Sequence, residues 1–277
     1  MGGTKCLVAF GTSGKDLSEP IRAETTTPDS TFQTLLGMLG EGRPDAVGVA
    51  CFGPLELDET RPNFGEILST PKTGWSGENV HQRFVEGLNV PVSLTTDVNG
   101  AALGEGRWGA AMGMSNFAFV TVGTGIGAGI VADGSLLAGE RHPEMGHLPV
   151  RRLDNDRHPG SCPFHGTCLE GMASGPALES RFGSPSNWAG NETVSDVATH
   201  YIAQGLVALV YTVSPERIVV GGGVSKLPGF HDRLRSRLAE LMADYPTIPD
   251  LDLLISPPGL DTSGLAGAVA LAMDRGE

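Results

Sequence analysis

Short apolar runs recur along the chain, and most are rich in β-branched residues or bounded by glycine. Such runs are typical of buried strands. The strands predicted in this way occupy residues 5–10, 46–51, 90–95, 116–122, 128–131 and 217–220. Between and after them, apolar residues recur at the spacing of one helix face. These stretches predict helices at residues 30–39, 98–107, 176–182, 194–213, 230–245 and 263–273. The mixture predicts an α/β fold class.

The chain has 277 residues, which is long enough for two domains of ordinary size. A predicted helix ends at Arg107, and a glycine-rich turn up to Gly113 leads into a new hairpin. We therefore expect an N-terminal α/β lobe at residues 1–107 and a C-terminal α/β lobe at residues 108–277. The last helix is expected to pack back on the N-terminal lobe.

The net charge of -13 argues against a nucleic-acid surface, because phosphate binding needs clustered Lys and Arg side chains. No segment reaches the roughly 18 uninterrupted apolar residues that span a bilayer, and the N-terminus lacks the pattern of a secretory signal. We therefore expect a cytoplasmic protein with no nucleic-acid or membrane partner. The four cysteines fit buried thiols and a metal site better than a disulfide framework.

The first candidate for phosphate binding is the Gly-Gly-Thr-Lys sequence of residues 2–5, which directly precedes a predicted strand. Backbone N–H groups, a hydroxyl and an ammonium could meet a phosphate there, although a plain turn at a chain terminus has the same sequence. Gly14 and Lys15 do not form a P-loop, because no Gly stands five residues before Gly14 and Asp16 replaces the required Ser or Thr.

Residues 117–131 form two apolar runs joined by alternating glycines around Thr124. This pattern predicts a β-hairpin with a glycine-rich turn. A dinucleotide-binding interpretation would need a helix after Gly125, but residues 128–131 are strand-like. Two interpretations remain, a hairpin whose open backbone holds phosphates and a hairpin with a structural role alone.

A third segment, residues 218–225, runs as a buried strand into three glycines and then toward a helix. Glycines at a strand end let a nucleotide lie against bare backbone. The three segments together suggest one nucleotide held between two lobes. The glycines of residues 263–268, which open the last helix, would close the base pocket or let helices pack closely.

Asp97 is the candidate catalytic base. It stands between the strand predicted at residues 90–95 and a predicted helix. A carboxylate at this place could accept a proton from a substrate hydroxyl, and we expect the helix N-terminus to keep it ionised. An ordinary helix cap is the alternative for an isolated Asp.

Metal-ligand spacing is the strongest chemical signal in the sequence. Cys162, His165 and Cys168 stand three residues apart in a loop rich in Pro and Gly. This pattern is typical of zinc sites, and a site with four protein ligands is structural because no coordination position stays open. From the residues alone, His147 and His158 are both candidates for the fourth ligand, and a chance grouping of two buried cysteines and a surface histidine is the alternative.

These motifs resemble those of ROK-family sugar kinases over nearly the whole chain. The similarity rests on Gly2-Gly3-Thr4-Lys5, Phe52-Gly-Pro54, Thr70-Pro-Lys-Thr-Gly-Trp75, the segment from Asp97 to Glu105, Gly123-Thr-Gly-Ile-Gly127, Pro143-Glu-Met-Gly-His147, residues 162–171 and Gly221-Gly-Gly223. Within this family, residues 70–75 and the histidine in the middle of the zinc loop resemble the bacterial fructokinases. Glucokinase-type members usually carry three cysteines in that loop.

The resemblance implies an actin-like (ribonuclease H-like) fold of two lobes with a zinc-binding loop at residues 147–168. It implies ATP-dependent phosphorylation of the primary hydroxyl of a hexose, most of all D-fructose to fructose 6-phosphate, with Asp97 as the base. The positions implied to face the sugar are Glu144, His147 and Glu170. Those implied to bind the nucleotide are Gly3, Thr4, Lys5, Thr124, Gly125, Pro176, Gly221, Gly222, Gly223, Val224 and Ser225. Mg²⁺ would bridge the phosphates, and a structural Zn²⁺ would be held by His147, Cys162, His165 and Cys168.

The resemblance also implies a homodimer, and a His147 that coordinates zinc through one nitrogen and offers the other to the sugar. Relatives usually begin with a strand that carries an acid two positions before the first glycine, so we expect the first strand to be truncated. The alternatives within the family are a kinase for glucose, mannose or an N-acylated hexosamine, and a non-catalytic sugar-binding or regulatory protein. A regulator would need a helix-turn-helix domain ahead of the kinase-like region, for which we see no room in this sequence.

Overall fold

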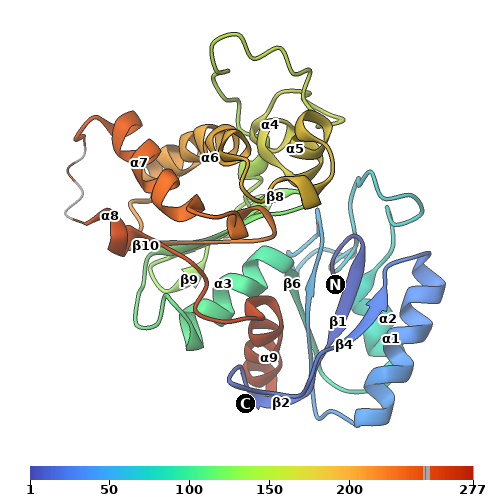
Figure 1. The fold of residues 1–277 in the computed structure, drawn as a ribbon. Coiled ribbons are helices and arrows are strands. Elements are labelled where there is room, and N and C mark those ends of the chain that lie inside the picture. The colour runs from blue at the N-terminus through green and yellow to red at the C-terminus, as the bar shows by residue number, and fades with distance from the viewer. Residues whose placement is uncertain (246, 248–249, 277) are drawn as a thin grey trace. The chain divides into compact units, whose positions relative to one another are not determined.

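The computed structural model describes residues 1–245, 247 and 250–276, and the chain forms two compact units. The first unit contains residues 1–113 and 137–142 and the chain from residue 259 onward, and the second contains residues 114–136 and 143–258. Each unit has strands and helices around a hydrophobic core of its own. Figure 1 draws the ribbon coloured along the chain. The predicted α/β class is confirmed.

The strands of the first unit are arranged in pairs. β1 (Lys5–Val8) pairs antiparallel with β4 (Ile21–Glu24), and β2 (Gly11–Ser13) pairs with β3 (Asp16–Leu17). β5 (Val47–Cys51) and β6 (Val92–Thr96) run parallel, with Cys51 opposite Thr96. The carboxyl ends of β5 and β6 therefore lie side by side at one edge of this unit.

The helices of the first unit are α1 (Pro28–Gly42), α2 (Val80–Leu88), α3 (Asp97–Trp108) and α9 (Ser263–Gly276). Side-chain caps mark the starts of α2 and α3. The side chain of Asn79 accepts a hydrogen bond from the N–H of Gln82 at 2.9 Å at the start of α2. The hydroxyl of Thr96 accepts one from the N–H of Asn99 at 3.2 Å at the start of α3. Both are favourable N-cap residues.

Glycines let α9 lie directly against α3 and β5. A Cβ atom on Gly267 would lie 1.6 Å from the carbonyl oxygen of Gly100, and one on Gly48 would lie 1.7 Å from that of Ala268. No side chain larger than hydrogen fits at either position, so these elements meet through their backbones. Of the two roles considered for the glycines at the start of the last helix, the structure therefore supports close helix packing.

Trp75 lies at the centre of the aromatic core of the first unit and is fully buried. Its ring packs edge-on against Phe52 with centroids 5.2 Å apart and lies 5.8 Å from the ring of Phe32. The indole N–H donates to the carbonyl oxygen of Thr26 at 2.8 Å, as a buried Trp requires. The Trp of residues 70–75 is therefore a core residue in this fold.

The second unit is built on a five-stranded sheet with the strand order β11-β10-β7-β8-β9. Figure 1 labels β8, β9 and β10 of this sheet. Its strands are β7 (Phe117–Val122), β8 (Ile126–Ala132), β9 (Ser135–Leu136), β10 (Arg217–Gly221) and β11 (Ile255–Ser256). β10 runs parallel to β7, and β8 runs antiparallel to β7. β7 and β8 thus form the hairpin that the alternating glycines predict.

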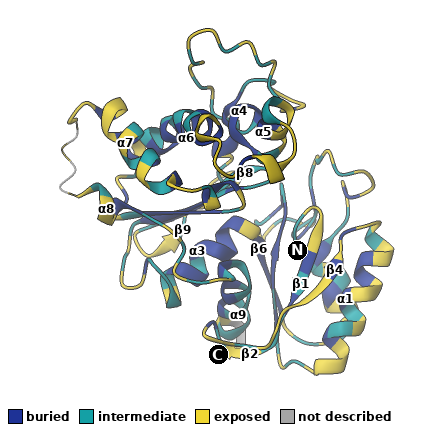
Figure 2. Ribbon diagram, viewed as in Figure 1, coloured by how far each residue is buried: buried dark blue, intermediate teal, exposed yellow. Residues whose placement is uncertain are grey.

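Helices pack around this sheet and bury most of its residues, which are dark blue in Figure 2. They are α4 (Leu169–Ala173), α5 (Gly175–Phe182), α6 (Glu192–Val213), α7 (Phe230–Met242) and α8 (Leu251–Leu254). α6 contributes Tyr201 and Leu206, which are fully buried in the core of this unit. The hydroxyl of Tyr201 donates to Asp156, which also pairs with Arg181 at 2.8 Å.

The predicted strands and helices are present, with shifted ends. The helix predicted at residues 230–245 ends at Met242, because Ala243 adopts the left-handed conformation with a φ of 48°. The strand predicted at residues 5–10 ends at Val8. Within the part of the chain that the structure describes, no helix combines the length and the apolar character needed to cross a membrane.

Candidate active site

Asp97 is the first residue of α3 and directly follows β6. Its Oδ1 accepts a hydrogen bond from the N–H of Val98 at 2.9 Å, and its side chain is exposed. The cap of α3 is Thr96, so Asp97 is not needed as an ordinary helix cap. Its carboxylate therefore lies where a substrate hydroxyl could reach it.

The surroundings raise the pKa of the Asp97 carboxyl above its ordinary value of 3.8. Desolvation is the largest cause, although one side of the group reaches solvent. It outweighs the Met1 ammonium charge and the N–H groups of Val98 and Asp97 itself, which lower the pKa. We expected the helix N-terminus to dominate, and the net direction is the opposite. A base with a higher pKa holds a transferred proton more firmly.

The N-terminal turn lies at the same edge of the first unit as Asp97. The carbonyl oxygen of Met1 accepts a hydrogen bond at 2.8 Å from the N–H of Phe52, directly after β5 and beside the end of β6. Residues 3–5 are exposed. An added Cβ atom at Gly3 would meet no other atom within 4 Å. Open backbone at this edge could receive a phosphate.

The carboxyl ends of β7 and β10 bring two predicted nucleotide-binding segments of the second unit together. The strands are parallel neighbours with Gly221 opposite Thr121, so the turn after β7 and the glycines after β10 share one edge of the sheet. Gly222 has a φ of 96°, and a Cβ atom there would lie 2.4 Å from the carbonyl oxygen of Val122. The hydroxyl of Ser225 donates to the carbonyl oxygen of Gly222 at 2.9 Å. Only glycine is compatible with this close approach.

The N-terminus of α5 lies at this edge as well. The N–H of Gly175 donates to the carbonyl oxygen of Gly123 in the hairpin turn at 2.7 Å. Pro176, which has no N–H group to leave unpaired, occupies the first turn of the helix. Thr124 and Gly125, in the same hairpin turn, therefore lie beside a helix N-terminus, where backbone dipoles favour anions.

Glu170 in α4 contacts the hairpin turn. Its Oε2 accepts a hydrogen bond from the N–H of Ile126 at 2.9 Å. A Cβ atom on Gly125 would lie 2.7 Å from the same oxygen, so the carboxylate fits here because residue 125 is glycine. A predicted sugar-facing side chain and a predicted nucleotide-binding residue are thus in contact.

Glu144 precedes the short 3-10 helix η1 (Met145–His147), and His147 is its last residue. This helix packs against the start of β8. A Cβ atom on Gly146 would lie 2.0 Å from the carbonyl oxygen of Ile126. Glu144 is exposed, and its carbonyl oxygen accepts from the N–H of His147 at 3.1 Å. Because Glu170 binds the N–H of Ile126, both predicted sugar-facing segments are anchored on one residue of β8.

Four side chains of the second unit form a cluster that could hold a metal ion, namely those of His147, Cys162, His165 and Cys168. Their candidate ligand atoms all lie within 4.8 Å of one another. The Nδ1 atom of His147 lies 3.7 Å from the Cys162 sulfur and 3.6 Å from the Cys168 sulfur. It lies 3.3 Å from the Nδ1 atom of His165. Tetrahedral zinc separates nitrogen ligands by about 3.3 Å and nitrogen from sulfur by about 3.6 Å, so the geometry fits zinc.

His147, and not His158, completes this cluster. The Nδ1 atom of His158 accepts a hydrogen bond from the N–H of Gly160 at 3.0 Å, and its Nε2 atom lies 3.3 Å from the Ser180 hydroxyl oxygen. The ring of His158 thus has other partners. His147 enters the cluster through Nδ1, and its Nε2 atom lies on the other side of the ring.

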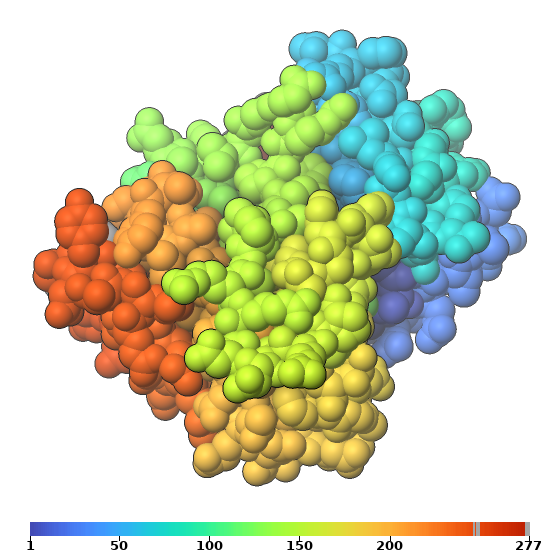
Figure 3. All heavy atoms as spheres, turned by 90° about the horizontal axis from the view of Figure 1, so that it is seen from above, coloured from blue at the N-terminus to red at the C-terminus, as the bar shows by residue number. Residues whose placement is uncertain are grey.

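Glycines shape the loop that carries the cluster. Gly160 has a φ of 84°, and a Cβ atom there would lie 1.9 Å from the carbonyl oxygen of Gly166. A Cβ atom on Gly171 would lie equally close, at 1.9 Å from that oxygen. Cys162 and Gly166 exchange backbone hydrogen bonds of 3.3 and 3.0 Å. The loop lies at the surface of the second unit, where it is yellow-green in Figure 3.

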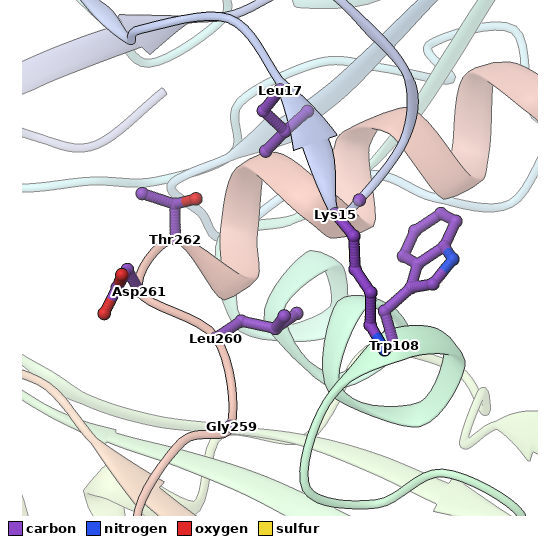
Figure 4. A pocket seen from close by; sticks show the side chains of 8 residues that line it. Lys15, Leu17, Trp108, Gly259, Leu260, Asp261 and Thr262 are labelled. Carbon is purple, nitrogen blue, oxygen red and sulfur yellow. The ribbon is translucent and has the colours of Figure 1, made fainter.

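An open pocket of about 470 Å³ lies at the other end of α3 (Figure 4). Lys15, Trp108 and residues 259–262 contribute to its lining. An α-helix rises about 1.5 Å per residue, so Asp97 at the start of α3 lies roughly 16 Å from Trp108 at its end. The lining contains none of the predicted site residues, and the pocket is not the predicted active site.

Two buried carboxylates with many partners were not among the predicted site residues. Glu56 binds Arg61 and Arg141. Glu105 accepts hydrogen bonds from the N–H of Gly259, which precedes α9, and from the hydroxyl of Ser263, the first residue of α9. Glu105 stands two helical turns after Asp97 in the same motif, and an acid at a helix position facing the core is a signal that could have identified it. Glu56 has no comparable local signal.

Comparisons with known proteins agree with these features. The model of the ROK family matches residues 1–275. The fructokinase of Zymomonas mobilis subsp. mobilis is 40% identical over 283 residues, which cover 98% of this chain and 94% of that protein. The ROK hexokinase of Thermus thermophilus has a similar structure, with a TM-score of 0.77, 26% identity and coverage of 99% and 96% of the two chains. A ROK family glucokinase from Streptomyces griseus, solved in complex with glucose and AMPPNP, has a TM-score of 0.80 at 22% identity, with 99% and 97% coverage.

The fold is therefore the actin-like fold of ROK sugar kinases, as the sequence motifs imply. The chain belongs to the ROK family.

Proposed function

We propose that this protein is an ATP-dependent fructokinase, which transfers the γ-phosphoryl group of ATP to the primary hydroxyl of D-fructose and forms fructose 6-phosphate. The observation that carries this proposal is the 40% identity to a fructokinase over 98% of the chain. The histidine in the middle of the Cys-His-Cys loop also favours a fructokinase over a glucokinase.

In the proposed reaction, Asp97 is the general base. Its carboxylate takes the proton of the sugar's primary hydroxyl while the hydroxyl oxygen forms a bond to the γ-phosphorus of ATP. The bond between that phosphorus and the bridging oxygen breaks, and ADP leaves with the electron pair. The exposed position of the carboxylate after β6 and its raised pKa both suit this role.

We propose that Glu144, His147 and Glu170 hold the sugar hydroxyls. Glu170 is fixed by the N–H of Ile126, and His147 is fixed by the cluster, so neither side chain needs to be ordered when the sugar binds. Preordered groups of this kind lower the entropic cost of positioning a substrate. The Nε2 atom of His147 would face the sugar while its Nδ1 atom faces the metal.

The nucleotide would bind to the glycine-rich edges of the two units. In the first unit the proposed contacts are Gly3, Thr4 and Lys5. In the second unit they are Thr124, Gly125, Pro176, Gly221, Gly222, Gly223, Val224 and Ser225. Mg²⁺, when bound with the nucleotide, supplies positive charge that stabilises the phosphates in the transition state.

We propose that the cluster of His147, Cys162, His165 and Cys168 holds a structural zinc ion. The distances between the ligand atoms support zinc, and four protein ligands leave no open position for catalysis. A homodimer, a cytoplasmic location and the two lobes at residues 1–107 and 108–277 stay predictions from the sequence. Glucose, mannose and N-acylated hexosamines stay the alternative substrates.

The test is ADP release with Mg-ATP and fructose, glucose, mannose or an N-acetylated hexosamine, for the native protein and for Asp97→Asn. The native protein should prefer fructose, and Asp97→Asn should lower kcat by roughly 10²- to 10⁴-fold. Asp45→Asn, which changes an exposed carboxylate of the first unit, is the matched control and should keep full activity. A preference for another hexose would contradict the substrate, and an active Asp97→Asn protein would contradict the base.

The pH profile of kcat/KM tests the same carboxylate. Asp97 acts as a base only when ionised, so activity should fall as the pH drops through a pKa above 3.8. A raised pKa also means that the folded state disfavours the ionised form, so the stability it contributes is lost as the pH rises through that pKa. The neutral amide of Asp97→Asn should therefore be at least as stable as the native protein at pH 7. Loss of activity with a lower melting temperature would point to unfolding instead of loss of the base.

A further inference from the structure

Residues 137–142, here called the strap, belong to the first unit although the chain on both sides of them belongs to the second. The Nε2 atom of His142 accepts a hydrogen bond from the N–H of Leu55 at 3.1 Å. A Cβ atom on Gly53 would lie 3.4 Å from the same nitrogen. The imidazole of His142 therefore contacts the backbone of residues 53–55.

Ion pairs add to this attachment of the strap. The carboxylate of Glu140 pairs with Arg61 at 2.7 Å, and Arg141 pairs with Glu56. The side chain of Glu56 is only 3% exposed, and it also accepts from Arg61 at 3.1 Å and from the N–H of Asp58 at 3.1 Å. A buried carboxylate with several donors resists displacement, because removing one donor would leave a buried charge less well compensated.

The surroundings of Glu56 favour the ionised form of its carboxyl group. Burial alone would raise the pKa of this carboxyl, but the N–H of Asp58 and the charges of Arg141 and Arg61 lower it overall. The attachment of the strap through Arg141 should therefore persist at neutral and mildly acidic pH.

The covalent chain connects this attachment to the sugar site. Glu144, a proposed sugar ligand, follows His142 by two residues, with Pro143 between them. Consecutive Cα atoms are about 3.8 Å apart, so the Cα of Glu144 lies within roughly 7.6 Å of that of His142. Pro143 fixes its own φ angle and restricts His142 to extended conformations. The placement of His142 thus limits where Glu144 can lie.

The strap is attached close to the catalytic edge of the first unit. Residues 53–55 follow β5 after one intervening residue, Phe52, and the last residue of β5, Cys51, stands opposite Thr96 in β6. Asp97 is the next residue of the chain. The backbone that contacts His142 therefore begins two residues after the end of β5, the strand that is paired with β6 beside the proposed base.

We propose that the strap is a positioning element of the sugar site, and that His142 and Glu56 are positioning residues that place Glu144 for binding the hexose. This rests on the proposed function, because it concerns the same sugar site. Neither residue is assigned contact with the sugar or the nucleotide. The strap acts through Pro143 and Glu144 on the affinity for the sugar.

The test compares His142→Ala and Glu56→Gln with the native protein. The hexose KM should rise roughly tenfold in His142→Ala, which is the effect of losing one partly buried hydrogen bond, while the ATP KM stays within about twofold. His142→Gln should restore part of the affinity, because its amide oxygen can accept from the N–H of Leu55. Glu56→Gln should raise the hexose KM as well.

Arg83→Gln is the matched control. Arg83 also pairs with two carboxylates of the first unit, Asp29 at 2.6 Å and Glu78 at 3.2 Å, but it lies on α2 and not on the strap. Its hexose KM should match that of the native protein. A rise equal to that of His142→Ala would show a general effect of losing polar contacts and would overturn the proposal.

Hydrogen exchange without sugar separates this proposal from the proposed function. In His142→Ala, backbone amides of residues 140–147 should exchange faster than in the native protein, whichever hexose is the substrate. If the native protein prefers glucose, the fructokinase proposal fails, and the role of the strap is then tested by the glucose KM of His142→Ala. If no hexose is phosphorylated, the rate of hydrogen exchange at residues 140–147 is the test of the strap. Unchanged exchange at residues 140–147, or a hexose KM unchanged in His142→Ala, would overturn the role of the strap.

Discussion

Glu105 is a fully buried carboxylate that joins separate parts of the first unit. Its Oε2 accepts hydrogen bonds from the N–H of Ala110 at 2.7 Å and of Gly259 at 2.9 Å. Its Oε1 accepts from the N–H of Leu260 at 3.2 Å and from the Ser263 hydroxyl at 2.5 Å. These donors belong to the turn after α3 and to the segment that leads into α9. One side chain therefore holds both segments against α3.

Glu105→Gln should lower the free energy of unfolding by about 3 kcal/mol, because an NH₂ group would replace an acceptor and face N–H donors that then lose their partner. Unfolding in urea at constant temperature measures this change. Glu86→Gln is the control, since Glu86 is exposed on α2 and accepts from Gln82 at 2.7 Å. It should change stability by less than about 0.5 kcal/mol. Equal stability of the two variants would contradict the role of Glu105.

Single residues could be predicted from the sequence only where a local pattern marks them. Asp97 stands at a strand-to-helix junction, and Cys162, His165 and Cys168 have ligand spacing. Glu105 could not be assigned its role, because Gly259 lies 154 residues further along the chain. His147 could be preferred as the fourth ligand only from the family resemblance, since the partners of His158 become visible only in the folded chain.

At the scale of elements, the hairpin of β7 and β8 and the helix α4 meet through Gly125 and Glu170. A Cβ atom on Gly125 would lie 2.7 Å from the Glu170 carboxylate, whereas one on Gly123 would meet no other atom within 4 Å. Gly125→Ala should therefore displace Glu170 and raise the fructose KM roughly tenfold, while Gly123→Ala should leave that KM unchanged. Steady-state kinetics at saturating ATP measures the difference. A similar fructose KM in both variants would contradict the contact's role in sugar binding.

Helices and strands whose apolar residues recur with a clear periodicity were predicted from the sequence, and short or polar elements were not. Alternating glycines between two apolar runs marked the hairpin of β7 and β8, and the length of α6 made its period clear. α2 was missed because Val80 and Phe84 are its only fully buried residues, and two positions do not establish a period. The strand pair β2 and β3 is mostly exposed and has no apolar pattern to detect.

At the scale of the whole molecule, the residues that the structure describes form two hydrophobic cores, one in each unit. The chain passes between the units after residues 113, 136, 142 and 258. All four residues of the proposed zinc cluster belong to the second unit, whereas Asp97 belongs to the first. Loss of the metal should therefore destabilise the second unit first, and with it the proposed sugar ligands that this unit carries.

Removal of zinc by a chelator tests whether the ion stabilises the second unit and not the first. We expect about one zinc ion per purified chain, because four protein ligands complete one tetrahedral site. Chelation should speed hydrogen exchange at residues 143–175, lower the melting temperature and raise the fructose KM, because the ring of His147 would lose the ion that orients it. Hydrogen exchange at residues 1–113 should stay unchanged.

The variant Cys162→Ser, which removes one ligand, should reproduce these effects and respond little to the chelator. Purified protein without zinc would contradict the metal, and an equal rise of exchange in residues 1–113 would show that the ion stabilises the whole chain and not the sugar-binding segment of one unit.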